Sequence, residues 1–204
     1  MRPGRVAVLR KLPYAPAMRL RVTLLHDGSN AAVEAALTAL WRAIPAEDVD
    51  VHLKSLDNAS VMPWVRTVQS VRDIYPWLTR DRTDVVHAWL ARPALVCGLL
   101  RQVPDSPALV TGIPGSAAQM DRAPLASAAH LAAAFLADMV TPCHADTAQW
   151  LIRSGLPSAA VAQVKDAGLV DDPAAIARHH MRLYNEVVAR DRPTWRRYIR
   201  LPRL

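Results

Sequence analysis

The sequence has few cysteines, few glycines and no long hydrophobic run. Only 2 of its 204 residues are cysteine and 7 are glycine. No stretch reaches the roughly 18 consecutive apolar residues of a membrane-spanning helix. The apolar run at residues 6–9 is too short for a signal peptide, and two prolines follow it. Cysteine and histidine nowhere fall at zinc-ligand spacing, so we expect no metal site.

The two cysteines, Cys97 and Cys143, lie far apart in apolar segments. We expect buried free thiols in a reduced, cytoplasmic protein, in preference to a disulfide. His179 and His180 are adjacent, so on a helix they point about 100° apart and share no metal easily. We predict that both are surface histidines.

Lysine is also scarce, because nearly all of the 25 basic residues are arginine. The net charge of +7 is concentrated at the two ends. Residues 1–17 carry +4 and residues 190–204 carry +5, which leaves −2 for the body between them. A nucleic-acid-binding domain needs a basic face on its folded body, so no nucleic-acid partner is expected.

The composition, with 51% hydrophobic and 21% charged residues, is that of a globular protein. Apolar strand-like runs recur about every 25 residues with helical patterns between them, which is typical of parallel βαβ units. Most of these strands are continuously apolar, so both sheet faces are covered, whereas the strand at 48–56 alternates apolar and polar residues, which predicts a half-buried strand near the sheet edge. We predict a doubly wound, mostly parallel Rossmann-like α/β sheet of about six strands. The expected strands are 20–25, 48–56, 84–89, 108–111, 139–141 and 160–165; the expected helices are 31–44, 63–78, 93–103, 124–136, 144–153 and 172–190, with a loop at 112–122.

In such a fold, ligands bind beyond the carboxyl ends of the strands. That rule selects the candidate binding residues Gly28, Ser29, Asn30, His87, Trp89, Arg92, Gly112, Gly115, Ser116 and His144. The Gly28–Asn30 turn holds a phosphate at a helix N-terminus or is an ordinary turn and cap, and it contains no G-x-G-x-x-G motif.

The other candidates also have two interpretations. His87 contacts a ligand or is a core histidine, and Trp89 is packing or a platform for a flat ligand. The glycines of the loop at 112–115 suggest unusual backbone angles and a site lining. His144 begins a helix, where a capping role is the plain interpretation. No catalytic constellation stands out, so the catalytic residues stay unknown and no cofactor is expected.

Three segments carry a family resemblance. Residues 84–89 read DVVHAW, residues 107–111 read PALVT before a glycine loop, and residues 137–142 read ADMVTP. In this order they resemble the amino-terminal, acceptor-side domain of family 4-type GT-B glycosyltransferases, whose strands read D-V-V-H-x-H and P-x-V-x-T-x-H-G. The resemblance spans residues 18–168. It implies a domain that binds the acceptor of a sugar transfer and a terminal helix that packs back onto it.

The sequence departs from the family pattern at important places. Trp89 stands where the family has its second histidine, and Pro114 or a neighbour replaces the histidine of the T-x-H-G segment. The resemblance ends before the family's carboxyl-terminal donor-binding domain, which we expect to be missing. The resemblance therefore implies a truncated or split enzyme that needs a donor-domain protein, with a small-molecule or lipid-linked acceptor.

Two other interpretations remain open: a non-catalytic binding module that retains the fold, and an unrelated Rossmann-like nucleotide binder.

The expected organisation is a basic leader at 1–17, the domain at 18–170, a helix at 171–190 and a basic tail at 191–204. Translation starts at Met1 or Met18. The tail packs on its own domain, docks a partner, or gives peripheral membrane contact.

Overall fold

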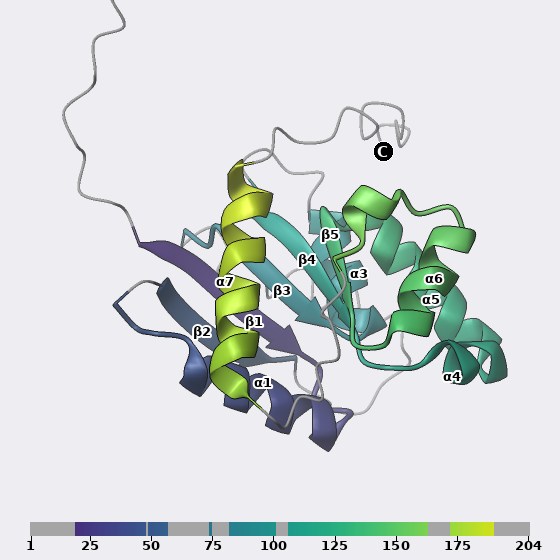
Figure 1. Cartoon of the computed structure of the whole chain (residues 1–204), viewed down its shortest axis with the longest axis horizontal. Coiled ribbons are helices and arrows are strands. Elements are labelled where there is room, and N and C mark those ends of the chain that lie inside the picture. The colour runs from purple at the N-terminus through teal and green to yellow at the C-terminus, as the bar shows by residue number, and fades with distance from the viewer. Residues whose placement is uncertain are drawn as a thin grey trace, which may run out of the picture.

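A computed structural model describes residues 19–47, 49–56, 74, 82–100, 106–162 and 172–189. Its centre is a parallel sheet with the order β2-β1-β3-β4-β5 (Figure 1). This order confirms the predicted doubly wound, Rossmann-like α/β fold. The strands are β1 (Leu20–His26), β2 (Val49–Ser55), β3 (Val85–Trp89), β4 (Ala108–Ile113) and β5 (Met139–Pro142).

Helices cover both faces of this sheet (Figure 1). Helices α1 and α7 pack together on one face, which we call the α7 face. Helices α3 and α5 pack together on the other, the α5 face, which α6 extends. The helices are α1 (Ala31–Ala43), α3 (Ala91–Leu100), α4 (Ala117–Arg122), α5 (Pro124–Leu136), α6 (Ala145–Arg153) and α7 (Pro173–Ala189), with a short 3-10 helix at Ser158–Ala160.

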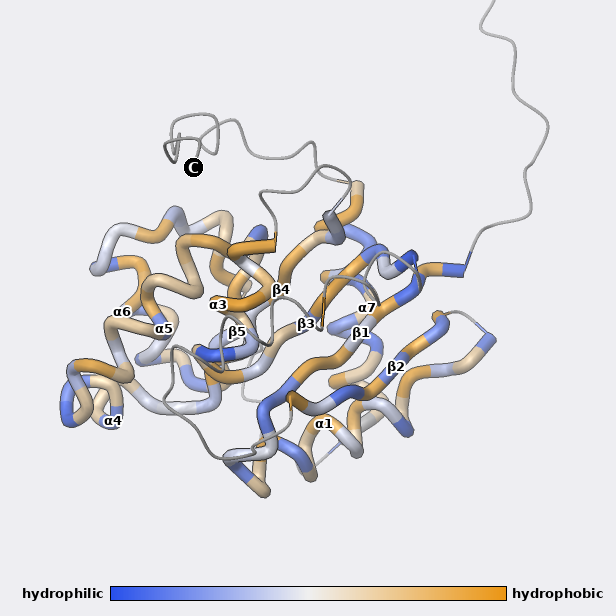
Figure 2. The backbone as a smooth tube through the Cα atoms, turned by 180° about the vertical axis from the view of Figure 1, so that it is seen from behind, coloured by the Kyte–Doolittle hydropathy of each residue, from blue (hydrophilic) through white to orange (hydrophobic). Residues whose placement is uncertain are grey.

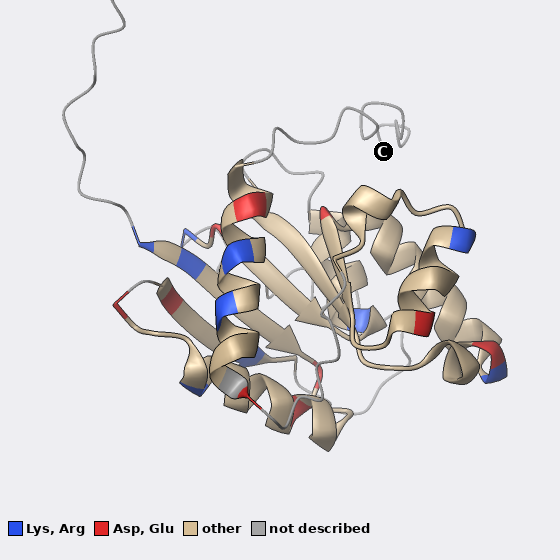
Figure 3. Ribbon diagram, viewed as in Figure 1, with Lys and Arg blue, Asp and Glu red and all other residues tan. Residues whose placement is uncertain are grey.

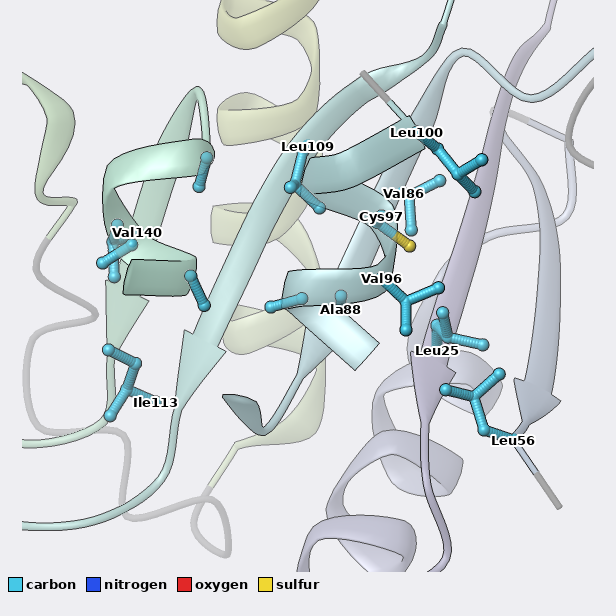
Figure 4. Packing of buried hydrophobic residues seen from close by; sticks show 14 of the residues in the cluster. Leu25, Leu56, Val86, Ala88, Val96, Cys97, Leu100, Leu109, Ile113 and Val140 are labelled. Carbon is cyan, nitrogen blue, oxygen red and sulfur yellow. The ribbon is translucent and has the colours of Figure 1, made fainter. Parts of the chain in front are cut away.

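Strand β3 contributes buried side chains to both faces of the sheet. Successive side chains of a strand point to opposite sides. Val86 and Ala88 join the α5 face, where they lie near Cys97 of α3 (Figure 4). Val85 and Trp89 join the α7 face. Apart from His87, the strand is therefore hydrophobic on both sides. In Figure 2 the tube mixes orange with paler and blue stretches, and along β2 it alternates orange with blue.

Charged residues lie on the outer parts of the described elements (Figure 3). On α7, for example, Arg178, Arg182 and Glu186 are exposed, whereas Leu183 and Tyr184 are buried. Within the described residues, none of the helices is long and apolar enough to cross a membrane. Both cysteines are free thiols, as expected, but only Cys97 is buried, whereas Cys143 is partly buried.

The structure corrects two details of the predicted order. In the described part of the expected sixth strand, residues 160–162, the structure has a single parallel bridge between Val140 and Val161, and residue 160 belongs to a 3-10 helix at Ser158–Ala160. Residues 163–165 of that strand lie outside the described residues. The expected loop at 112–122 instead holds the end of β4 and then α4. The leader at 1–17, the helix expected at 63–78 apart from Ile74, and the tail at 191–204 lie outside the described residues.

Candidate functional site

The turn from β1 into α1 lies at the carboxyl edge of the sheet, and its hydrogen bonds are mostly between its own residues. Gly28 adopts φ 68°, a left-handed conformation that glycine accepts without strain. Its amide donates to Nδ1 of His26 at 3.1 Å, and the Ser29 amide donates to Oδ1 of Asp27 at 3.0 Å. Both acceptor side chains are buried. These two amides are therefore engaged before any ligand arrives.

Asn30 continues the same pattern as the N-cap of α1. Its Oδ1 accepts from the amides of Ala32 at 3.0 Å and Val33 at 3.2 Å. The amides that a phosphate would need at a helix N-terminus are thus largely satisfied by the chain itself. Asn30 therefore caps α1, as the interpretation of an ordinary turn and cap predicts.

The turns after β4 and β5 are tied together. The Thr147 hydroxyl donates to the Gly115 carbonyl at 2.7 Å, and the Ala117 amide donates to Oδ2 of Asp146 at 3.0 Å. Ser116 is the N-cap of α4 in a capping box. Neither Gly112 nor Gly115 has a positive φ, so the unusual backbone angles predicted for this loop are absent.

Three further positions complete the carboxyl edge. His144 is the exposed N-cap of α6, and its side chain makes no capping hydrogen bond. Arg92 is half-buried in the first turn of α3. Between Trp89 and Arg92, Leu90 adopts φ 76°, a strained conformation for a residue with a side chain.

Two of the candidate residues lie under α7 and not at the solvent-exposed edge. Trp89 is 2% exposed, and His87 is fully buried. Gly112 pairs with Trp89 across β3 and β4, and a Cβ on Gly112 would lie 2.5 Å from the indole ring. Because Gly112 has no side chain, the indole of Trp89 occupies the space where a Cβ would otherwise lie. In this state Trp89 is core packing and offers no open platform.

His87 is held by hydrogen bonds from both sides. Its Nδ1 lies 2.8 Å from the Tyr184 hydroxyl of α7, and its Nε2 lies 3.1 Å from the Thr141 hydroxyl of β5. The Thr141 hydroxyl donates to the Thr111 carbonyl at 3.3 Å, so its oxygen accepts from Nε2–H of His87. Nδ1 is then the acceptor of the Tyr184 proton. The chain of donors runs in one direction from α7 into the sheet.

The cluster keeps its groups neutral. Burial, with the nearby His180, lowers the pKa of His87 well below its usual value. Burial lowers the pKa of His180 to about 4, against a smaller raising effect of its bond to the Ile176 carbonyl. Burial also raises the pKa of the Tyr184 hydroxyl. Neutral groups of this kind position neighbouring elements and do not transfer protons near neutral pH.

The expectation that His179 and His180 are surface histidines is wrong for His180, which is 2% exposed. The signal was present in the sequence. The apolar positions of the last helix, Ala177, Leu183 and Tyr184, fall at the three- and four-residue spacing of one helix face, and residue 180 lies on it. Sequence reasoning also missed Tyr184, Thr141 and the Asp146 carboxylate that cross-links the edge.

The ten candidate residues thus separate into two groups. Gly28, Ser29, Asn30, Gly115, Ser116 and His144 lie along the carboxyl edge, with Arg92 half-buried close behind Trp89 in the sequence. His87, Trp89 and Gly112 lie in the core beneath α7. Among the described residues, no group of three or more His, Cys, Asp or Glu side chains suits a metal ion. A shallow hollow of about 470 Å³ lies elsewhere, at the outer edge of β2 and the end of α1.

No family model and no curated protein matches the chain, but solved structures do. UDP-GlcNAc 2-epimerase from Methanocaldococcus jannaschii is 14% identical with a TM-score of 0.57, over 71% of this chain and 45% of that one. The lipopolysaccharide outer core galactosyltransferase WaaB is 10% identical with a TM-score of 0.57, over 70% and 44%. Sucrose-phosphate synthase from Thermosynechococcus elongatus is 14% identical with a TM-score of 0.58, over 83% and 99%.

These neighbours are glycosyltransferase-like proteins of the GT-B type, and the match is one of fold. The chain spans less than half the length of the epimerase and of the galactosyltransferase. It therefore has the architecture of one half of a GT-B protein.

Proposed function

We propose that this chain is the acceptor-binding half of a GT-B-type glycosyltransferase and needs a separate donor-binding chain to transfer sugar. GT-B transfer takes place between two domains, so one half supplies positioning and the other the stabilisation of the leaving diphosphate. The similarity to less than half of a galactosyltransferase and of a UDP-GlcNAc 2-epimerase supports this division.

The observation that carries the proposal is the self-satisfied turn of residues 26–30. A nucleotide diphosphate needs free backbone amides, whereas the amides of Gly28 and Ser29 already donate to side chains of this turn. The edge keeps exposed side chains, such as His144, that suit the hydroxyl groups of an acceptor. An uncharged acceptor therefore fits this edge better than a sugar nucleotide.

The experiment is a ¹H–¹⁵N NMR titration of the full chain with a panel of neutral mono- and disaccharides, and separately with UDP-GlcNAc. We expect saccharides to shift the amides of Gly28, Gly115 and His144, with a smaller response to UDP-GlcNAc. The variant His144→Ala weakens the response, and the matched control His52→Ala on β2 leaves it unchanged. Shifts confined to the hollow near Trp41, or stronger binding of UDP-GlcNAc than of any saccharide, contradict the proposal.

The requirement for a partner has its own test. The chain is co-purified with the product of a neighbouring reading frame that encodes a donor-type domain, and UDP release from UDP-sugars is measured. We expect release only when both chains are present. Release by the chain alone, or none by a pair that forms a stable complex, overturns the split-enzyme proposal.

A second candidate is a non-catalytic binding module, which the packing of Trp89 against Gly112 favours. At that place the resembling family has a histidine, and here an indole fills the space. Saccharide binding without UDP release in any complex is the result that selects this function.

A further inference from the structure

We propose that α7 is an acid-sensitive latch: protonation of His180, which stacks on His87 beneath the helix, releases α7 from the sheet. The two rings lie nearly parallel, with centroids 5.3 Å apart and planes at 29°. The inference does not depend on the proposed function, because it concerns only the helix and the strands beneath it.

The weak point of the cluster is one nitrogen of His180. Its Nδ1 lies 2.9 Å from the Ile176 carbonyl one turn earlier and donates to it. The other nitrogen, Nε2, is buried and has no hydrogen-bond partner among the described residues. A proton added at Nε2 would therefore be a buried charged donor without an acceptor, which is the costly kind of buried group.

His87 cannot relieve this charge. Both of its nitrogens are engaged, Nδ1 by Tyr184 and Nε2 by Thr141. Neither residue supplies a negative charge, because burial keeps the Tyr184 hydroxyl protonated. A protonated His180 reaches water by leaving the His87 stack, and the stack joins α7 to β3.

Among the residues that the structure describes, the groups around the pair offer it no counterion. On α7 itself the nearest titratable neighbour is His179, whose like charge opposes protonation of His180, while Arg178, Arg182 and Glu186 are exposed. The charged residues Glu34 and Arg42 of α1 are also exposed.

The described strands beneath α7 add no negatively charged side chain on this face. The buried side chains of β1 on this face are Val22 and Leu24, before His26 at the strand end. After β5, the partly buried Cys143 has its pKa raised to about 11 by burial, so it stays a neutral thiol.

The direction of the pH effect follows from proton linkage. A histidine whose pKa is lower on the sheet than in water binds a proton more readily when α7 is released. With a pKa of about 4 in the docked state, the opening constant of α7 rises roughly 50-fold from about pH 7 to about pH 4.5. Protonation of His87 in the released state adds to this rise.

The test is hydrogen exchange of the full chain, read as protection factors so that the intrinsic pH dependence of exchange is removed. We expect the protection of α7 amides to fall by about 50-fold or more between about pH 7 and about pH 4.5, while that of α3 amides changes much less. An equal fall in α3 and α7 means global unfolding and overturns the latch, as does unchanged protection of α7.

Two variants separate the latch from a general loss of stability. His180→Phe keeps an aromatic ring and removes the proton site of residue 180, so the pH response of α7 protection should shrink by roughly 50-fold, to the part that His87 contributes. The matched control His130→Phe replaces a buried histidine of α5, whose pKa burial also lowers, and should leave the response of α7 intact. If His180→Phe retains the full pH response, or if His130→Phe abolishes it, His180 is not the trigger.

Discussion

The two faces of the sheet are covered by helices in different ways. On the α5 face, helices α3 and α5 meet the strands almost entirely through aliphatic side chains such as Val96, Ala133 and Leu109 (Figure 4). On the α7 face, apolar packing surrounds a directional chain of hydrogen bonds from Tyr184 through His87 to Thr141. Aliphatic contacts supply free energy without fixing one position, whereas a buried polar chain tolerates only one register.

The comparison predicts which face is sensitive to pH. Leu109→Ala on the α5 face removes a side chain that is 1% exposed. The free energy of unfolding should fall by about 2–5 kcal/mol, because transfer energy is lost and a cavity remains. Urea unfolding at neutral and mildly acidic pH should give the same loss at both. A loss that depends strongly on pH breaks the comparison.

Gly112→Ala tests the packing of the α7 face. The new Cβ would lie 2.5 Å from the ring of Trp89, which is itself buried, so the indole or the strand must move. We expect about 1–3 kcal/mol of lost stability in urea unfolding. The matched control is Gly115→Ala, whose Cβ meets the mobile end of Met120 and should cost under about 1 kcal/mol. Equal losses for both variants contradict the role assigned to Trp89.

Tyr184→Phe breaks the polar chain while keeping the ring. His87 Nδ1 then loses its donor in a buried place, so we expect about 1–2 kcal/mol of lost stability. Thr141→Val removes the opposite end of the chain. Since both act through His87, a double-mutant cycle in urea should show that the two losses are not additive. Simple additivity would mean that the two bonds are independent.

Much of this architecture is predictable because it follows from hydrophobic patterning. The continuous apolar runs gave β1, β3, β4 and β5 within one or two residues at their described ends, and the helix expected at 124–136 matches α5 at both ends. Patterning works here because the inner strands, such as β3, are buried on both faces and are largely apolar, whereas the edge strand β2 alternates polar and apolar residues. Proline and glycine around residue 114 concealed α4, although Ser116 and Gln119 are the capping-box pair that marks its start.

The candidate site was harder to predict because the sequence gives the type of each residue but not how deeply its side chain is buried. A histidine after two valines and a histidine within a helix give no sign that their rings stack, since they are 93 positions apart in the chain. Topology correctly put Gly28, Gly115 and His144 at one edge, because the carboxyl ends of parallel strands meet there. The burial of His87 and Trp89 depends on α7, which packs over β3.

The smallest effects concern the helix N-termini at the carboxyl edge, where α1 and α6 differ. Asn30→Ala removes a side chain that caps two amides of α1, so about 1 kcal/mol of stability should be lost. His144→Ala should change stability by less than about 0.5 kcal/mol, because the imidazole is exposed and caps nothing. Thermal unfolding of both variants beside the unaltered chain measures the difference. A large loss for His144→Ala would give that residue a role in folding. A negligible one leaves it free for a ligand and makes the variant a clean probe of saccharide binding, because its fold is then unchanged.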